Sequence, residues 1–395
     1  MPLPAINDIE AFHDEMTEWR RDIHAHPELG FEETRTADIV AEKLESFGLE
    51  VHRGVGKTGV VASLRVGNSP RAIGLRADMD ALPIQEENGF DYRSQHDGKM
   101  HACGHDGHTT MLLGAARHLN ATRNFDGCVH FIFQPAEEGL GGALAMLEDG
   151  LFEQFPMDAV YGMHNGAGLP IGTFAIRPGP MMAGAAFFDI DIQGVGSHGA
   201  RPENSVDPVV VASHIVTALQ SIVARNAKPT DTLVISVTRI HSGEAYNVIP
   251  QTARLGGTVR CFSNAVMQLA EARMGKIAAD IADAFGATAT LDFRRIFDPL
   301  VNDADETAFC ADVAAGLVGE ENVNRNRSLI MASEDFSFML QKRPGAFINI
   351  GNGDGPESCM VHNPGYDFND KILALGASYW VKLVETKLTK EALTG

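Results

Sequence analysis

Apolar residues recur along the chain with two periods that alternate. Spacings of three and four residues predict amphipathic helices, and short continuous apolar runs predict buried strands. In the first part of the chain the predicted helices are 7–24, 34–47 and 109–119, and the predicted strands are 60–66, 72–76, 128–133 and 159–163. Strands that alternate with helices predict an α/β domain with a doubly wound, mostly parallel sheet.

The pattern changes after Gly179-Pro180. Strands at 187–193, 232–240, 253–262 and 287–294 and helices at 207–225 and 264–285 follow the order β-α-β-β-α-β. That order is typical of a ferredoxin-like domain. The rest returns to α/β character, with helices at 306–317 and 370–388 and a strand at 346–350. We therefore expect a catalytic domain made of residues 1–183 and 295–395, with a ferredoxin-like domain inserted at 184–294.

Composition narrows the class of protein. A chain of 395 residues is long enough for two domains. Its net charge of −20 disfavours nucleic acid and anionic membrane partners, and no apolar run approaches the roughly 18–20 residues of a membrane span. The five cysteines are odd in number and widely spaced, which predicts reduced thiols. With no visible signal peptide, we expect a cytoplasmic location.

The densest chemical signal is one short run, His101-Ala-Cys103-Gly-His105-Asp106-Gly-His108. Thiolate and imidazole are preferred ligands of borderline-soft divalent ions. A catalytic thiol with a histidine base is a second interpretation, and chance clustering is a third. The run alone leaves all three open.

Further donors follow predicted strands or precede the last helix. They are Asp78 and Asp80, the adjacent pair Glu137 and Glu138, His164, and His362. The carboxyl ends of strands in α/β sheets are where ligands bind. Of two adjacent carboxylates, one can bind an ion while the other takes a proton from water. The aspartates are interpreted as ligands or as residues that orient ligands.

Together these runs resemble a known family. The motifs are Arg76-Ala-Asp-Met-Asp-Ala-Leu-Pro83, His101-Ala-Cys-Gly-His-Asp-Gly-His108, Gln134-Pro-Ala-Glu-Glu-Gly139, Gly162-Met-His-Asn165 and His362-Asn-Pro-Gly-Tyr-Asp-Phe-Asn-Asp370. They are similar, in order and over essentially the whole chain, to the amidohydrolase branch of the aminoacylase/carboxypeptidase metallopeptidases. That branch includes hippurate hydrolases, N-acyl-amino-acid amidohydrolases and auxin-conjugate hydrolases.

The resemblance implies a role for each matching residue. The implied ligands of two divalent ions are Cys103, His105, Glu138, His164 and His362, with Cys103 bridging. Glu137 matches the general base. His198 matches a residue of the inserted domain that supports the transition state, usually across a dimer interface. Asn247 and Arg260 match groups that engage the substrate carboxylate, so a small N-acyl amino acid is the expected substrate and a homodimer or dimer of dimers the expected assembly.

One departure from the wider clan affects the identity of the metal. Many relatives carry His-x-Asp where this chain has Asp78-Met-Asp80, so the His ligand is absent, and Cys103 stands in the bridging region where others use a carboxylate. Zn suits a thiolate ligand, but Mn, Co and Ni also fit the mixed donors, so the expected ions are Mn, Zn, Co or Ni. A dipeptidase or carboxypeptidase of the same clan, a cysteine hydrolase using Cys103, and a non-catalytic binding protein are the alternatives. The intact Glu137 and complete ligand set count against the last.

Overall fold

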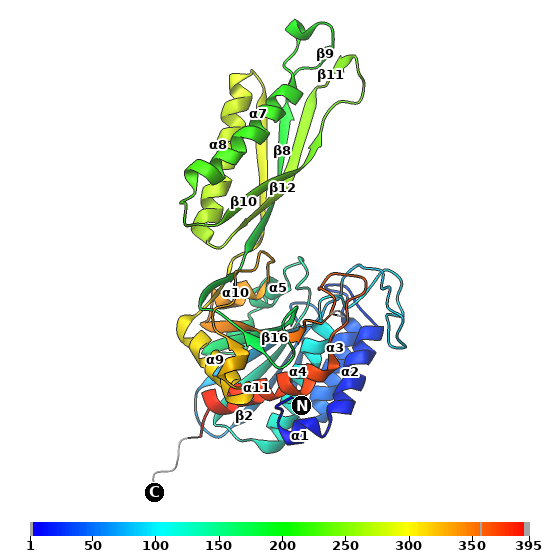
Figure 1. Ribbon diagram of the computed structural model, residues 1–395, viewed down its shortest axis with the longest axis vertical. Coiled ribbons are helices and arrows are strands. Elements are labelled where there is room, and N and C mark those ends of the chain that lie inside the picture. The colour runs from blue at the N-terminus through cyan, green and yellow to red at the C-terminus, as the bar shows by residue number, and fades with distance from the viewer. Residues whose placement is uncertain (1–2, 356–357, 391–395) are drawn as a thin grey trace. The chain divides into compact units, whose positions relative to one another are not determined.

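The computed structural model describes residues 3–355 and 358–390. These form two compact units, coloured along the chain in Figure 1. Unit 1 contains residues up to 179 together with 301–328 and 335 onwards, and unit 2 contains 180–300 and 329–334. The predicted insertion, 184–294, lies within unit 2. Residues 329–334, expected in the catalytic domain, group with unit 2 instead.

Unit 1 is built on a sheet of eight strands in the order β1-β2-β4-β3-β5-β16-β6-β15. Their bounds are β1 Glu50–Val55, β2 Gly59–Val66, β3 Ala72–Asp78, β4 Gly127–Gln134, β5 Ala159–Ala167, β6 Phe174–Ala175, β15 Val323–Asn324 and β16 Gly345–Gly353. The central strands β4, β3, β5 and β16 run parallel, while β1, β2 and β6 add antiparallel pairings. The doubly wound, mostly parallel sheet predicted from the sequence is confirmed.

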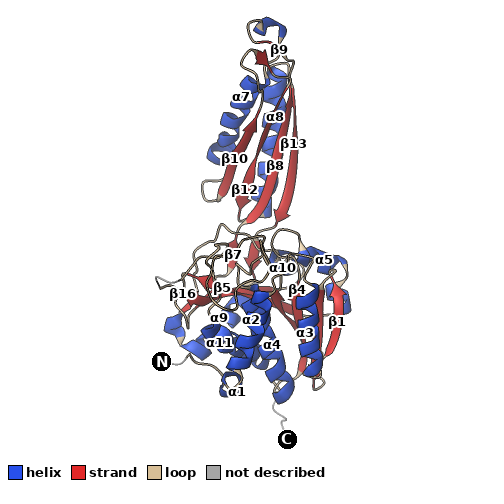
Figure 2. Ribbon diagram, turned by 90° about the vertical axis from the view of Figure 1, so that its right-hand side faces the viewer, coloured by secondary structure: helices blue, strands red, loops and turns tan. Residues whose placement is uncertain are grey.

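Helices cover both faces of this sheet, as Figure 2 shows. They are α1 Asn7–Glu10, α2 His13–Ala25, α3 Thr34–Ser46, α4 His105–Thr122, α5 Gly142–Glu148, α6 Leu151–Gln154, α9 Ala304–Val318, α10 Phe336–Leu340 and α11 Leu373–Lys387. Helices α3, α4, α9 and α11 share one core with the sheet, and α5 and α10 contact strands from the other face. Strands buried on both faces explain the continuous apolar runs of the sequence.

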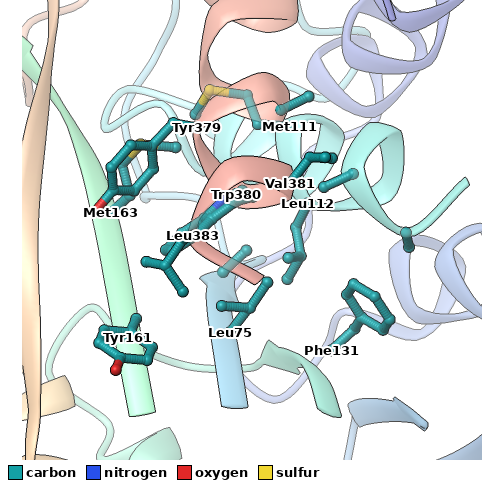
Figure 3. Close-up of a cluster of buried hydrophobic side chains, with 14 of the residues drawn as sticks. Leu75, Met111, Leu112, Phe131, Tyr161, Met163, Tyr379, Trp380, Val381 and Leu383 are labelled. Atoms are coloured by element: carbon teal, nitrogen blue, oxygen red, sulfur yellow. The ribbon is translucent and has the colours of Figure 1, made fainter. Parts of the chain in front are cut away.

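The packing of the core between α4, α11 and the sheet determines where the first turn of α4 lies relative to the strands. Leu75 and Phe131 from the strands meet Leu112 from α4 and Trp380 from α11, all of them fully buried or nearly so (Figure 3). Each such side chain contributes about 2 kcal/mol through burial. This packing holds the first turn of α4 against the carboxyl ends of β3 and β5.

Unit 2 has an antiparallel sheet in the order β10-β12-β8-β13, with two helices that share its core. In chain order its elements are β8 Gly184–Gln193, α7 Pro208–Ser221, β10 Leu233–His241, β12 Thr252–Cys261, α8 Asn264–Ala284 and β13 Thr288–Phe297. This is the predicted β-α-β-β-α-β order. Short pairs are formed by β9 Ser197–His198 with β11 Val248–Ile249, and by β7 Gly179–Met182 with β14 Leu300–Asn302.

One helical stretch, Pro208–Asn226, is long and apolar enough by composition to cross a membrane. The apolar pattern predicts this helix, at 207–225, but no membrane span. Val211, Ile215 and Leu219 on this stretch are buried against the sheet of unit 2. A helix that packs on a sheet passes the same test, so the stretch is weak evidence for a span.

The structure corrects the predicted bounds of two helices and one strand. The first helix is two helices, because Phe12 leaves the helical conformation. Helix α4 begins at His105, four residues before the predicted start, because its polar first turn is buried by tertiary contacts. Strand β5 continues to Ala167, since it pairs with β16 from Val160 to Ala167. His164 therefore lies within a strand rather than after it.

Candidate metal centre and catalytic site

The site forms where the parallel strands β3, β4 and β5 end. Asp78 is the last residue of β3, Glu137 and Glu138 follow β4, and His164 lies in the second half of β5. Because carboxyl ends of parallel strands meet at one edge, residues more than 80 positions apart lie together. The loop before α4 adds Cys103 to the same edge, and the first residue of α4 adds His105.

Gly104 lets Cys103 and His105 approach one centre. Its φ of +97° lies in the left-handed region, which favours glycine. A Cβ added here would lie 2.3 Å from Asn165 Oδ1 and 2.7 Å from the Tyr366 hydroxyl. Only glycine fits both the conformation and the space.

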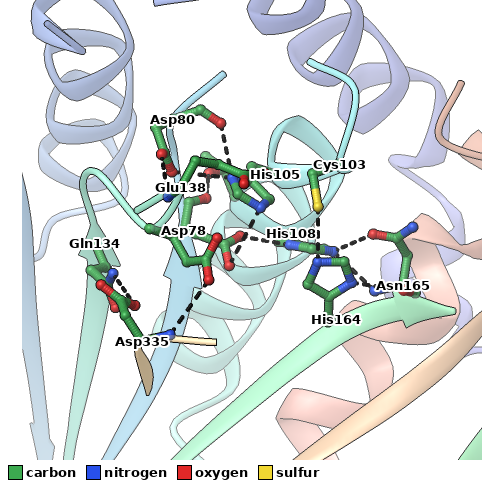
Figure 4. Close-up of polar contacts among 12 residues, drawn as sticks. Asp78, Asp80, Cys103, His105, His108, Gln134, Glu138, His164, Asn165 and Asp335 are labelled. Carbon is green, nitrogen blue, oxygen red and sulfur yellow. Dashed lines mark hydrogen bonds and ion pairs between the residues drawn. The ribbon is translucent and has the colours of Figure 1, made fainter. Parts of the chain in front are cut away.

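The five predicted ligands come together as two groups of donors that share Cys103. One group is Cys103, His105 and His164, and the other is Cys103, Glu138 and His362; in each, the ligand atoms lie within 4.8 Å of one another. Cys103 Sγ lies 3.3 Å from His164 Nε2 (Figure 4), and His362 Nε2 lies 3.2 Å from Glu138 Oε1. Two groups with one shared thiol have the arrangement of a dinuclear site.

Asp80 orients both groups. Its backbone oxygen lies 2.8 Å from His105 Nδ1, and its carboxylate accepts the backbone N–H of Glu138 at 2.9 Å. With Nδ1 engaged, the buried Nε2 of His105 makes no hydrogen bond among the described residues. A ligating histidine that holds its other nitrogen on an oxygen is typical of metal sites. The donors therefore fit a pair of divalent ions.

Asp78 groups with His105 and His108, but its carboxylate is already engaged by neighbouring side chains. Its carboxylate contacts His108 Nδ1 at 2.6 Å and accepts a hydrogen bond from Arg76 at 2.6 Å. Burial alone would raise its pKa, but His105, Arg76 and His108 hold the pKa of Asp78 well below the usual value. The negative charge of Asp78 thus persists in the interior, close to where cations would bind.

Burial shifts the pKa values of the donors before any ion is considered. It lowers the pKa of His164 well below the ordinary value, and it raises the pKa of the Cys103 thiol. Hydrogen bonds to Cys103 and Glu138 raise the pKa of the more exposed His362 to about 10. A bound cation has the opposite effect on Cys103: it deprotonates a coordinating thiol outright, so the sulfur binds as a thiolate.

Glu137 is buried beside the donors. It groups with His105 and Glu138 within 4.8 Å, and only 7% of the residue is exposed. Its Oε1 accepts the backbone N–H of Asp335 at 3.4 Å. A carboxylate here can reach a water held by the neighbouring donors.

Several further residues, which were not predicted as part of the site, hold this edge of the sheet together. Arg76 donates from Nε to Gln134 Oε1 at 2.8 Å and contacts Asp335 Oδ1 at 3.1 Å. Gln134 also donates to Asp335 at 2.7 Å, and Asn165 Oδ1 lies 2.7 Å from His108 Nε2. Arg76 and Gln134 stand inside the recognised motifs, which was the available signal. Asp335, in Ser333-Glu-Asp-Phe336, lies outside those motifs.

In unit 2, His198 and Asn247 are neighbours, but Arg260 is distant from both. His198 pairs with Val248, and the Gly199 N–H donates to the Asn247 carbonyl at 2.7 Å. Strand β12 runs from Thr252, which follows β11 closely in sequence, to Cys261, so Arg260 lies eight residues beyond Thr252 along the strand. At about 3.3 Å per residue this is roughly 26 Å. Within unit 2, these three residues cannot touch one small molecule.

Residues 74–386 match the family described as Peptidase family M20/M25/M40. The chain is 44% identical over 384 residues to hippurate hydrolase of Campylobacter jejuni, covering 96% of this chain and 98% of that one. It is 41% identical to IAA-amino acid hydrolase ILR1-like 4 of Arabidopsis thaliana, covering 93% and 84%. It is 38% identical to N-acetylcysteine deacetylase of Bacillus subtilis, covering 95% and 97%.

A solved structure supports the same assignment. The fold matches a dinuclear metal-binding peptidase of the M20 family from Bacillus subtilis with a TM-score of 0.84 and 34% identity, covering 96% of this chain and 99% of that one. The resemblance inferred from the motifs is thereby confirmed. The chain belongs to peptidase family M20/M25/M40, and it is a metal-dependent amidohydrolase.

Proposed function

We propose that this amidohydrolase cleaves the amide bond of N-acyl amino acids, releasing a carboxylic acid and a free amino acid. The observation that carries the proposal is the pair of donor groups that share Cys103, with the buried Glu137 carboxylate beside them. The names of the similar proteins support it, since hippurate, an IAA-amino acid and N-acetylcysteine are all N-acylated amino acids.

Five residues are the proposed ligands of two divalent ions: Cys103, His105, Glu138, His164 and His362. Mixed sulfur, nitrogen and oxygen donors suit Zn, Mn, Co or Ni. When bound, such ions lower the pKa of a water toward neutrality and stabilise negative charge on a carbonyl oxygen. The thiol at the centre favours the softer ions of this set, Zn among them.

Glu137 is the proposed general base. Its carboxylate accepts a proton from the attacking water, and the same oxygen returns the proton to the amide nitrogen as the C–N bond breaks. A positioned general base contributes typically about 100-fold to 10,000-fold in rate. The buried setting of Glu137 also keeps competing solvent away from the transferred proton.

Arg260, Asn247 and His198 are the proposed substrate contacts from unit 2. A guanidinium binds a carboxylate with two parallel hydrogen bonds, which suits Arg260 to the carboxylate of the amino acid. Most of β12, roughly 26 Å from Thr252 to Arg260, separates Arg260 from the end of the strand near His198 and Asn247. One chain is therefore not expected to supply all three to one substrate. We therefore propose a homodimer in which His198 and Asn247 act at the partner's metal site.

The test is a substrate panel on metal-reconstituted enzyme: N-acetyl and N-benzoyl amino acids beside free dipeptides. The proposal expects the acylated compounds to have the higher kcat/KM. A preference for dipeptides with a free amino group would establish a dipeptidase instead. Activity that survives complete metal removal but not alkylation of Cys103 would favour a cysteine hydrolase.

A further inference from the structure

Glu33 is a buried carboxylate in unit 1 that the proposed mechanism does not use. It lies immediately before α3, more than 100 residues from Glu137 in sequence, and its side chain is fully buried. Burial of a carboxylate is unfavourable unless its oxygens accept hydrogen bonds. Its hydrogen-bond partners therefore indicate its role.

Both oxygens of Glu33 have specific donors. Oε1 accepts the backbone N–H of Ala136 at 2.8 Å, and Oε2 accepts the hydroxyl of Thr58 at 2.6 Å. Ala136 directly precedes the proposed base, Glu137. The side chain of Glu33 thus holds the main chain of the loop that carries the catalytic carboxylate.

That loop needs holding, because Ala136 is in an unfavourable conformation. Its φ of +51° lies in the left-handed region, which non-glycine residues rarely adopt. A non-glycine residue keeps such a conformation only where contacts with the surrounding structure hold it there. The Gly142 N–H binds the Ala136 carbonyl at 3.0 Å, and a Cβ added at Gly30 would lie 3.0 Å from the Ala136 Cα. With Glu33 on its N–H, Ala136 is fixed from three directions.

The contact acts on Glu137 more than on Glu138. The backbone N–H of Glu138 has a separate acceptor, the Asp80 carboxylate, at 2.9 Å. Loss of the Glu33 contact frees the peptide before Glu137 while this second contact still holds the proposed metal ligand. Loss of the Glu33 contact is therefore expected to displace the Glu137 carboxylate while the proposed metal ligands stay in place.

We propose that Glu33 is a positioning residue, which holds Ala136 in its left-handed conformation and so aims the Glu137 carboxylate at the reacting water. The catalytic part rests on the proposed function of Glu137 as base. The structural part, that Glu33 fixes the Gln134–Gly139 loop, stands on the contacts alone. Each part has its own measurement.

The kinetic arm compares Glu33→Ala with Glu33→Gln on the N-acyl amino acid that the wild type cleaves best. Glu33→Ala should lower kcat at least about 10-fold, since small misplacements of a catalytic group are costly, with KM and metal content nearly unchanged. Glu33→Gln keeps an acceptor for the Ala136 N–H and should restore kcat to within about 3-fold of wild type. A Glu33→Gln variant as impaired as Glu33→Ala would overturn the catalytic part.

Glu28→Ala is the matched control. Glu28 is a nearby carboxylate whose oxygens accept the backbone N–H groups of Thr36 at 2.8 Å and Arg35 at 3.0 Å. Its side chain makes no hydrogen bond to the Gln134–Gly139 loop among the described residues. This variant should lose stability without losing kcat. An equal fall in kcat would mean that the effect of Glu33→Ala is general loosening, and it would overturn the proposal.

The structural arm needs no substrate. Hydrogen exchange followed by mass spectrometry on the metal-loaded protein should show faster exchange at residues 134–139 in Glu33→Ala, but not in Glu28→Ala. Unchanged exchange in that loop would sink the structural part, whatever the kinetics show. If Glu33→Ala does not fold, Thr58→Val serves instead, with a smaller increase in exchange expected. A wild type inactive on all N-acyl amino acids would refute the proposed function, and the exchange data would still decide the role of Glu33.

Discussion

Cys103, His105 and His164 are enclosed by the sheet and helices of unit 1, whereas His198 and Asn247 are exposed on the short β9–β11 pair of unit 2. In the first group each side chain has a neighbour that fixes its direction, such as Asp80 for His105. In the second group the polar ends project from the surface. These three donors are thus preorganised, while the proposed substrate contacts acquire their full set of partners only on binding.

The difference indicates where each kind of substitution will act. Changes in the enclosed group should alter the chemical step or the metal content, because no motion is needed to assemble that group. Changes in the exposed group should alter substrate binding or depend on a second chain. The predictions below test this division, from the largest expected effect to the smallest.

Glu137→Gln should give the largest loss of rate, at least about 100-fold in kcat, because it removes the general base. Metal content measured by elemental analysis should stay at the wild-type level, since Gln keeps the size of the side chain. Near-normal kcat in this variant would remove Glu137 from its role and place proton transfer elsewhere at the site.

His198→Ala should lower kcat by about 10-fold to 100-fold, the scale of one transition-state donor. His241→Ala, an exposed histidine of β10 in the same unit, is the matched control and should have little effect.

A mixture of the His198→Ala and Glu137→Gln proteins tests whether His198 acts at the site of the partner subunit. If His198 acts at the partner's site, each mixed dimer has one complete site, and about a quarter of wild-type activity should return after subunit exchange. No recovery in dimers shown to have mixed would mean that His198 acts within its own chain or not at all.

Arg260→Lys should raise KM about 10-fold with a smaller change in kcat, because a lysine cannot form two parallel hydrogen bonds to a carboxylate. Burial already lowers the pKa of Arg260, so its surroundings favour a partner of opposite charge. Steady-state kinetics on an N-acyl amino acid and on its amide, which lacks the carboxylate, separates the effects. Equal losses on both substrates would contradict a role in carboxylate binding.

The last prediction concerns stability rather than rate, and it comes from Glu33. Burial raises its pKa from 4.5 to about 7, so between these values the folded protein binds more protons than the unfolded chain. The free energy of unfolding therefore falls as pH rises through this window, by about 3 kcal/mol from this residue. Glu33→Gln should show a shallower fall between pH 4.5 and 8 in urea denaturation. Parallel curves for both proteins would refute the raised pKa.

Part of the site was predictable because its candidate donors are local in sequence. Cys103 and His105 stand two positions apart, and Glu137 and Glu138 are adjacent. Residue type and spacing left a metal site, a catalytic thiol and chance open, and the resemblance to the family supplied the ligand set. The doubly wound sheet followed from alternating apolar patterns. The ferredoxin-like order of unit 2 was equally visible, because its strands and helices are long and separate.

The features that could not be predicted from the sequence depend on contacts between distant segments. The hydrogen bond between Gln134 and Asp335 joins residues 201 positions apart, and that from Ala136 to Glu33 joins residues 103 apart. The left-handed conformation of Ala136 had no glycine to indicate it. Residues 329–334 pack with unit 2 although more than 25 residues separate them from its main segment.

The central claim is that Cys103 joins two metal sites, and a crystal structure of metal-loaded protein tests it most directly. Anomalous scattering recorded at the absorption edge of the bound metal should reveal two ions in unit 1, both within bonding distance of the Cys103 sulfur. His105 and His164 should lie at one ion, and Glu138 and His362 at the other. A single ion that does not touch Cys103, or ions bound elsewhere on the chain, would contradict the account.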